Sequence, residues 1–260
     1  MQISEHELRG MTADLVDRHE ATLPAMRENL SEMVSNLRES GLGAPSRRGF
    51  LVGGGVLVGG FALAACGGSD DDTTGDASSS TDNDSSGSKK LEGDLIVVGL
   101  AAALEIGAVN TYQKVLDAAG SGAIKDVPPA VATFVQTAQK QHQDHAAAWN
   151  GVLTGAGFAA IKDTSNLPSV EMLITERLAG VKDVGSAATL ALDLENIAAA
   201  TYFGGIGAIS DPGGIKVAAS ILPVETQHAA ILNFVLGKYP VPSTFITADG
   251  AVGPDAFVQR

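Results

Sequence analysis

Two short patterns, each present twice, place single polar side chains in otherwise apolar stretches of this sequence. Residues 104–112 read Leu-Glu-x-x-Ala-x-x-Thr-Tyr, and residues 194–202 repeat that pattern. Residues 142–147 read His-x-x-His-Ala-Ala, and residues 225–230 read Glu-x-x-His-Ala-Ala. Side chains three residues apart lie on the same face of an α-helix. Each copy therefore predicts two helices, one with an isolated glutamate and one with a polar pair on a single face.

The polar pair of the second copy, Glu225 and His228, lies on a helix face that is otherwise apolar. Its neighbours are Ile221, Leu222, Val224, Ala229, Leu232 and Val235. A carboxylate buried without a partner is too costly to keep, because it loses its hydration. A divalent metal ion would supply the partner. Two such helix pairs predict an all-α fold, a four-helix bundle with polar ligands at its centre.

This arrangement resembles the ferritin-like superfamily, the carboxylate-bridged di-metal bundles that include rubrerythrins, bacterioferritins and manganese catalases. The likeness extends to exported bacterial ferritin-like proteins related to the plant desiccation-associated group, and it covers roughly residues 91–237. One position departs from the family. Its first Glu-x-x-His reads His-x-x-His here, with His142 in place of the glutamate.

Six carboxylates and imidazoles of the two copies form the candidate metal site. They are Glu105, His142, His145, Glu195, Glu225 and His228. Carboxylate oxygens mixed with imidazole nitrogens suit one or two ions of iron or manganese, and zinc can occupy the same set. Tyr112 and Tyr202 each follow an isolated glutamate by two helical turns and so share its face. They are candidates for a hydrogen bond or a radical near the metal, although core packing is the commoner role of tyrosine.

The resemblance implies a redox metal centre that reacts with O₂ or peroxide, as a ferroxidase, a peroxidase or a catalase-like protective protein. The alternative is a bundle that keeps the fold without the metal and serves a structural, stress or desiccation-tolerance role. Three isolated carboxylates in an apolar core favour a metal. His142 weakens that argument, because a neutral imidazole cannot bridge two ions as a carboxylate does, and it predicts a site holding closer to one metal than two.

Other classes of protein fit the sequence less well. The net charge of −13 predicts repulsion from nucleic acid and anionic lipid surfaces, so we expect no nucleic-acid partner. A solute-binding lipoprotein would show alternating strands and helices, and no such pattern occurs. A ferritin storage cage does not suit a membrane-tethered subunit, although a homodimer remains open.

Residues 1–45 predict an amphipathic helix in two runs separated by Pro24, with apolar residues every three or four positions. One interpretation is a cytoplasmic interaction helix. The other, which we favour at this stage, is an unusually long leader or a start codon placed too early. Neither interpretation includes this segment in the folded domain.

Residues 46–65 resemble a twin-arginine export signal, with Arg47 and Arg48 ahead of an uncharged stretch. That stretch is diluted by glycine, which suits an export signal better than a permanent membrane span. It ends at Cys66, the only cysteine, in a context that resembles a lipobox, and we expect this thiol to be lipidated. Residues 66–90 then read as a disordered Ser- and Asp-rich tether. The expected partners are the twin-arginine export machinery and the membrane, and the expected location is the outer face of the cytoplasmic membrane.

Residues 91–260 form the predicted ferritin-like four-helix domain with an irregular C-terminal tail. Four bundle helices are expected, at about 94–119, from near Pro128 and Pro129 to just before Gly155, at about 184–209 and at about 215–237. A shorter connecting helix is expected at 168–182. Asp94 is expected to cap the first of them. The tail from residue 238 is expected to cover the outside of the bundle.

Overall fold

The computed structural model describes residues 4–41, 90–243 and 245–259. Its elements are α1 (Glu5–Glu39), α2 (Asp94–Gly120), α3 (Pro129–Gly155), α4 (Pro168–Leu178), α5 (Val184–Ile206), α6 (Pro212–Val235) and a 3₁₀ turn (Pro254–Ala256). The described residues contain no strand, which confirms the all-α fold. The export signal at Arg47 and Arg48 and the lipidation site at Cys66 lie outside them, so both stay predictions.

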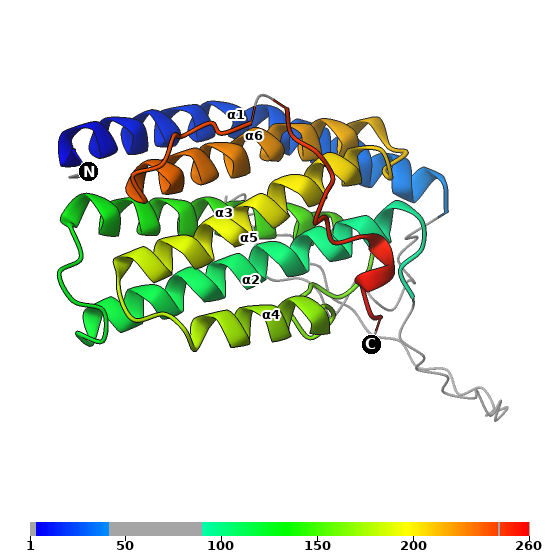
Figure 1. Cartoon of the computed structure of the whole chain (residues 1–260). Helices are drawn as coiled ribbons and strands as arrows, with labels where there is room; N and C mark the ends of the chain where they lie inside the picture. Colours follow the sequence, from blue (N-terminus) through cyan, green and yellow to red (C-terminus); the bar gives the residue numbers. More distant parts are fainter. Residues whose placement is uncertain (1–3, 42–89, 244, 260) are drawn as a thin grey trace, which may run out of the picture. The chain divides into compact units, whose positions relative to one another are not determined.

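The bundle consists of two helix pairs that face each other. α2 packs along α3, and α5 packs along α6, each pair being joined by a short loop. α2 also packs against α5, which brings the two pairs together (Figure 1). α4 lies in the longer connection between the pairs and packs on α2 and α5. This is the layout that the near-repeat predicts, with one pair of helices from each copy.

Local capping explains where the second pair of helices begins. Asp183 precedes α5 and accepts a hydrogen bond from the N–H of Ser186 at 2.7 Å. The Ser186 hydroxyl in turn accepts from the N–H of Asp183 at 3.1 Å, which completes a capping box. Asp211 caps α6 through the N–H of Gly214 at 2.9 Å. With this cap and a proline at its first position, α6 begins at Pro212, ahead of the predicted start at 215.

Other details of the predicted helix ends were also wrong. Asp94 is the first residue of α2 and not its cap, and its carboxylate accepts hydrogen bonds from the N–H groups of Ser210 and Asp211. α4 ends at Leu178 and α5 at Ile206, both earlier than predicted. A glycine follows each of these ends within two residues, and glycine disfavours helix continuation.

α1 belongs to the folded body, which the interpretation of residues 1–45 as a leader or interaction helix left out. It is a single helix that runs through Pro24 and packs along α3 and α6 (Figure 1). Its buried apolar residues are Leu8, Leu15, Met26, Met33 and Leu37. An amphipathic stripe shows that a helix has a surface to cover, but it does not show which surface. The bundle supplies that surface here.

The two backbones come close where α1 crosses the start of α6. A Cβ atom at Gly213 would lie 2.4 Å from the carbonyl oxygen of Asn29, so only glycine fits there without a shift. Nearby, Asn36 Nδ2 of α1 donates a hydrogen bond to Asp211 Oδ2 at 2.7 Å. These contacts hold the C-terminal half of α1 against α6.

The tail after α6 returns across the bundle to the beginning of α2 (Figure 1). Val252 N–H donates to Thr201 Oγ1 of α5 at 2.9 Å, and Leu91 N–H donates to Gln259 Oε1 at 2.5 Å. Phe257 is buried among residues of α2 and α4. The tail therefore covers one end of the helix pairs, as the sequence predicts for an outer segment.

Among the described helices, α2 is the one long and apolar enough to cross a membrane by length and composition. Of its most apolar stretch, 67% is nevertheless buried inside the bundle. Its apolar character therefore fits a core helix, and Glu105 lies in its middle.

Candidate metal centre

Four helices turn polar side chains into the middle of the bundle. They are Glu105 from α2, His142 and His145 from α3, Glu195 from α5, and Glu225 and His228 from α6. None of the six is more than 2% exposed. The structure thus brings together every residue of the candidate site that the near-repeat predicts.

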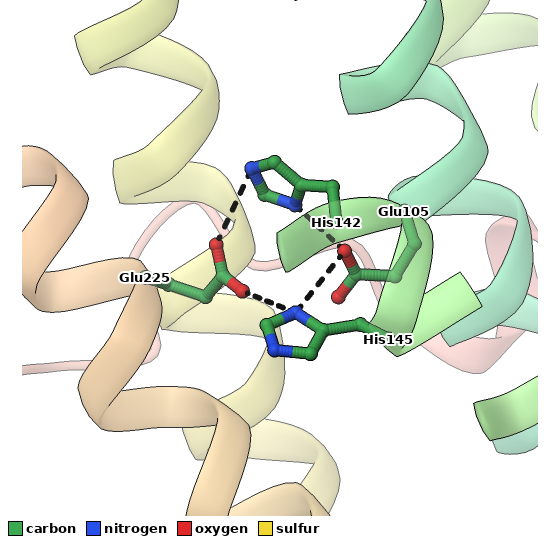
Figure 2. A group of neighbouring side chains, drawn as sticks. All are labelled: Glu105, His142, His145 and Glu225. Carbon is green, nitrogen blue, oxygen red and sulfur yellow. Dashed lines mark hydrogen bonds and ion pairs between the residues drawn. The ribbon is translucent and has the colours of Figure 1, made fainter. Parts of the chain in front are cut away.

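The first group of ligand atoms lies between α2, α3 and α6 (Figure 2). Glu105 Oε2 is 2.7 Å from His142 Nδ1 and 3.5 Å from His145 Nδ1. Glu225 Oε1 is 3.2 Å from the same nitrogen of His145. Two carboxylates and two imidazoles therefore converge on one point, with His145 presenting Nδ1 to both carboxylates.

The second group lies between α3, α5 and α6. Glu195 Oε1 is 3.1 Å from His142 Nε2, and Glu195 Oε2 is 3.3 Å from His228 Nδ1. Glu225 Oε2 is 3.6 Å from His228 Nδ1. The two groups share Glu225 and His142, and each nitrogen of His142 faces a different group. The centre therefore consists of two overlapping ligand sets, one on each side of a shared pair.

A family model described as a ferritin-like domain matches residues 93–238. The chain belongs to the ferritin-like family. The match spans α2 to α6 and all six residues of the centre, whereas α1 lies outside it. No curated protein and no solved structure matches the chain.

The donor atoms of this ferritin-like centre fit a metal ion. Both carboxylate oxygens of Glu225 and both ring nitrogens of His145 are buried and make no hydrogen bond. Buried polar atoms without partners are rare in native proteins, because each one loses its hydration without compensation. Glu225 Oε1 and His145 Nδ1 face each other at ion-pair distance, and a cation coordinated by both atoms would satisfy them.

The charges of the centre also balance without a metal. Burial lowers the pKa of His142, but the charges of Glu225 and Glu195 outweigh burial and raise this pKa well above 6.5. Burial is likewise outweighed at His145, where the charge of Glu105 raises the pKa to about 9. The pKa of Glu105 falls to about 2, because the charge of His145 and the hydrogen bond from His142 outweigh burial. At neutral pH the carboxylates therefore face imidazolium rings, and a metal ion must displace protons to bind.

Each of the two tyrosines binds the glutamate of the other helix pair, so the two hydrogen bonds cross between the pairs. The Tyr112 hydroxyl of α2 donates to Glu195 Oε1 of α5 at 2.5 Å. The Tyr202 hydroxyl of α5 donates to Glu105 Oε1 of α2, and it accepts a hydrogen bond from Trp149 Nε1 at 2.8 Å. The other oxygen of Glu105 faces His142 and His145, whereas in Glu195 the oxygen bound by Tyr112 also faces His142 and the other oxygen faces His228. The predicted hydrogen-bonding role of both tyrosines therefore has a definite geometry, in which each copy of the repeat holds the glutamate of the other.

Gln141 contacts the centre, although it was not among the six predicted ligands. Its side chain is buried, and its Oε1 lies 2.8 Å from His228 Nε2. Its Nε2 donates to the backbone carbonyl of Leu15 in α1 at 3.3 Å. Because the amide nitrogen is used as a donor, Oε1 accepts from His228, which places the neutral-ring proton on Nε2 and leaves Nδ1 free to bind a metal. The sequence offered only one signal, a polar residue directly before His142.

His19 of α1 also lies beside the centre, although the sequence analysis set it apart with the leader. It is 4% exposed, and its ring centroid is 5.2 Å from that of His145. Its Nε2 is 3.4 Å from Asp144 Oδ2. Burial, with the nearby charge of His145, lowers the pKa of His19 to about 4, so this ring is neutral at physiological pH. The available signal was its place in the apolar stripe, one helical turn after Leu15.

A small cavity reaches the centre from the side covered by α4. Its volume is about 30 Å³, and its lining includes His142 and Glu195 together with Val170 and Ile174 of α4. A water molecule needs roughly 10–15 Å³ of such space, so the cavity admits molecules of the size of water, O₂ or peroxide.

Proposed function

We propose that this ferritin-like protein binds one or two iron or manganese ions at the paired ligand sets and uses them in reactions with O₂ or peroxide. Zinc fits the same donors. The observation that supports this most is the pair of overlapping ligand sets, which join three carboxylates and three imidazoles from four helices in a fully buried position. Ferroxidase, peroxidase and catalase-like protection are the activities in view.

Bound iron or manganese would supply the electron transfer that O₂ or peroxide chemistry requires. The residues of the chain hold and orient the donors. Tyr112 and Tyr202 each bind one oxygen of a glutamate and so fix the orientation of its carboxylate toward the histidines. The burial of the centre excludes bulk water, and the cavity beneath α4 leaves space for a small molecule beside His142 and Glu195.

A non-catalytic bundle is the second candidate, and the charge balance favours it. Because His142 lies between Glu105 and Glu195 with its pKa raised, an imidazolium can occupy the middle of the centre in place of a metal. Such a bundle would serve a structural or stress-tolerance role. It would be most stable with no metal bound.

Elemental analysis of protein purified from its own host separates these two functions, because metal added after refolding can load a site artificially. The first function predicts bound iron or manganese together with consumption of ferrous iron or peroxide. Glu195→Gln should lower both, whereas Asp193→Asn should change neither, since Asp193 pairs with Arg177 at the surface. Protein that carries no metal and consumes neither substrate supports the non-catalytic bundle.

We also propose that the protein is exported by the twin-arginine route and held on the outer face of the cytoplasmic membrane by lipid on Cys66. The support is the sequence pattern at Arg47, Arg48 and Cys66. Cleavage ahead of Cys66 would cut the chain between α1 and the bundle, so α1 would stay only through its packing contacts. Cys66→Ala should leave the folded protein soluble after membranes are washed with salt. A variant that still sediments with membranes would refute the lipid anchor.

A further inference from the structure

α1 lies outside the ferritin-like match. It nevertheless contacts side chains next to His145 and His228, the two histidines that each belong to only one ligand set. Its own buried polar side chains are Thr12 and His19. Thr12 donates its hydroxyl to the carbonyl of Leu8 within the helix. The two ring nitrogens of His19 make no hydrogen bond although both are buried. A buried imidazole whose nitrogens make no hydrogen bond calls for a role beyond packing.

The ring nitrogen of His145 that faces away from the carboxylates also has no hydrogen-bond partner. The Nδ1 atom of His145 faces Glu105 and Glu225, which leaves Nε2 directed away from the carboxylates and without a hydrogen bond. Metal-binding histidines almost always donate their second ring N–H to a neighbouring acceptor, which fixes the ring and its tautomer. The His19 ring lies 5.2 Å away between centroids, close enough for a ring nitrogen to accept that proton after a small rotation. On its other side, His19 has the Asp144 carboxylate at 3.4 Å.

His228 is held from the same helix by another path. Its Nε2 donates to Gln141 Oε1, and Gln141 donates to the carbonyl of Leu15, one turn before His19 on α1. Both histidines are thus linked to one turn of α1, His228 to Leu15 through Gln141 and His145 to the neighbouring ring of His19.

We propose that α1 is the fifth helix of the metal centre, in which His19 accepts the Nε2–H of His145 and the Leu15 carbonyl fixes His228 through Gln141. His19 is a positioning residue and not a ligand, since it acts on the metal through His145. This inference rests on the proposed metal-binding function.

The test compares three variants of the full chain with the wild type. His19→Leu removes the acceptor, and His19→Gln keeps an acceptor of similar reach. His6→Leu is the matched control, because it makes the same change at an exposed position of the same helix. Affinity for Mn²⁺ is measured by chelator competition, and the absorption spectrum of the Co²⁺-loaded protein reports ligand geometry. His19→Leu should weaken Mn²⁺ binding in the first ligand set, which contains His145, about tenfold or more and change the Co²⁺ spectrum, while His19→Gln largely restores both.

Two further measurements separate positioning from packing. Thermal unfolding of the metal-free variants should show a lower Tm for His19→Leu, because the buried Nε2–H of His145 loses its acceptor, and His19→Gln should restore the Tm, which loss of packing alone would not explain. Exchange of the His145 ring N–H with water, followed by NMR in metal-free protein, should be slow in the wild type and fast in His19→Leu. Unchanged Mn²⁺ affinity together with unchanged ring N–H exchange in His19→Leu overturns the inference. Wild-type protein that binds no metal refutes the proposed function instead, and the ring N–H exchange then decides the His19–His145 contact alone.

Discussion

Replacing His142 with glutamate tests how the centre divides its charge between protons and metals. In the wild type, three carboxylates carry −3 against +4 from two divalent ions, whereas a fourth carboxylate would balance two ions fully. A single ion in the second ligand set uses His142 Nε2 and leaves its Nδ1–H to donate to Glu105 at 2.7 Å. Glu105 is then engaged by a ligand of the second set, so the first set, which contains His145, holds its ion more weakly. We therefore expect the wild type to retain closer to one metal than two.

The magnitudes follow from what His142→Glu removes and adds. Without metal, the variant loses the cation between Glu105 and Glu195 and gains a carboxylate, which should destabilise the apoprotein by about 3–5 kcal/mol. Metal should restore stability, by about 2.7 kcal/mol for each site held at a hundredfold excess over its Kd. Metal stoichiometry, O₂ or peroxide turnover and the metal-dependent rise in Tm should all increase.

The assay combines elemental analysis after dialysis with thermal unfolding of apo and metal-loaded protein. His142→Gln is the control, because it removes the cation without adding a carboxylate and should not raise the stoichiometry. Two tightly bound metals in the wild type that are lost in His142→Glu would refute the reasoning. That result would mean that each nitrogen of His142 binds its own ion.

Three further perturbations test the electrostatics and packing. The pKa of His145 is about 9 in the folded protein and 6.5 for the free side chain, so its contribution to metal-free stability is complete below pH 6.5 and is lost as pH rises through 9. The pKa of Glu105 is about 2 in the folded protein and 4.5 for the free side chain, so its contribution is complete above pH 4.5 and is lost as pH falls toward 2. Urea unfolding of the apoprotein should show both losses, the first on the order of 3 kcal/mol, and metal affinity should weaken as pH falls because protons compete. Gly213→Ala should lower stability by about 1–3 kcal/mol by forcing α1 from α6, whereas Gly151→Ala, which meets no neighbour, should be neutral or stabilising in the same thermal melts. Tyr202→Phe should cost about 1–3 kcal/mol in metal-free protein, because Glu105 and the indole N–H behind the hydroxyl both lose a partner; an unchanged Tm would contradict the crosswise contact.

The near-repeat was sufficient to predict the bundle and the clustering of six polar side chains. Helical spacing determines which side chains share a face, and the cost of burying a lone carboxylate at Glu105 or Glu195 requires such faces to meet. Helix ends were predicted less well, because they depend on long-range acceptors. Asp94 shows this, since its carboxylate binds N–H groups more than a hundred residues away along the chain.

The position of α1 could not be predicted for a different reason. Its apolar stripe is compatible with a partner protein, a membrane surface or the bundle, and spacing alone does not distinguish among them. The roles of Gln141 and His19 depend on that choice, because one contacts α1 and the other belongs to it. Sequence patterns identify residues that bind a metal directly more readily than residues that orient them.

The crosswise tyrosines have a consequence for symmetry. Each helix pair carries one glutamate and one tyrosine, and the tyrosine binds the glutamate of the other pair. Each half therefore supplies the hydrogen-bond donor that the glutamate of the other half needs. Two identical halves related by a two-fold axis would satisfy this requirement equally well. Such a dimer would, however, present two histidines or two glutamates at the positions of His142 and Glu225. A single chain that contains both halves can place one of each there, because its halves are free to differ, and this permits a centre with two unequal sides.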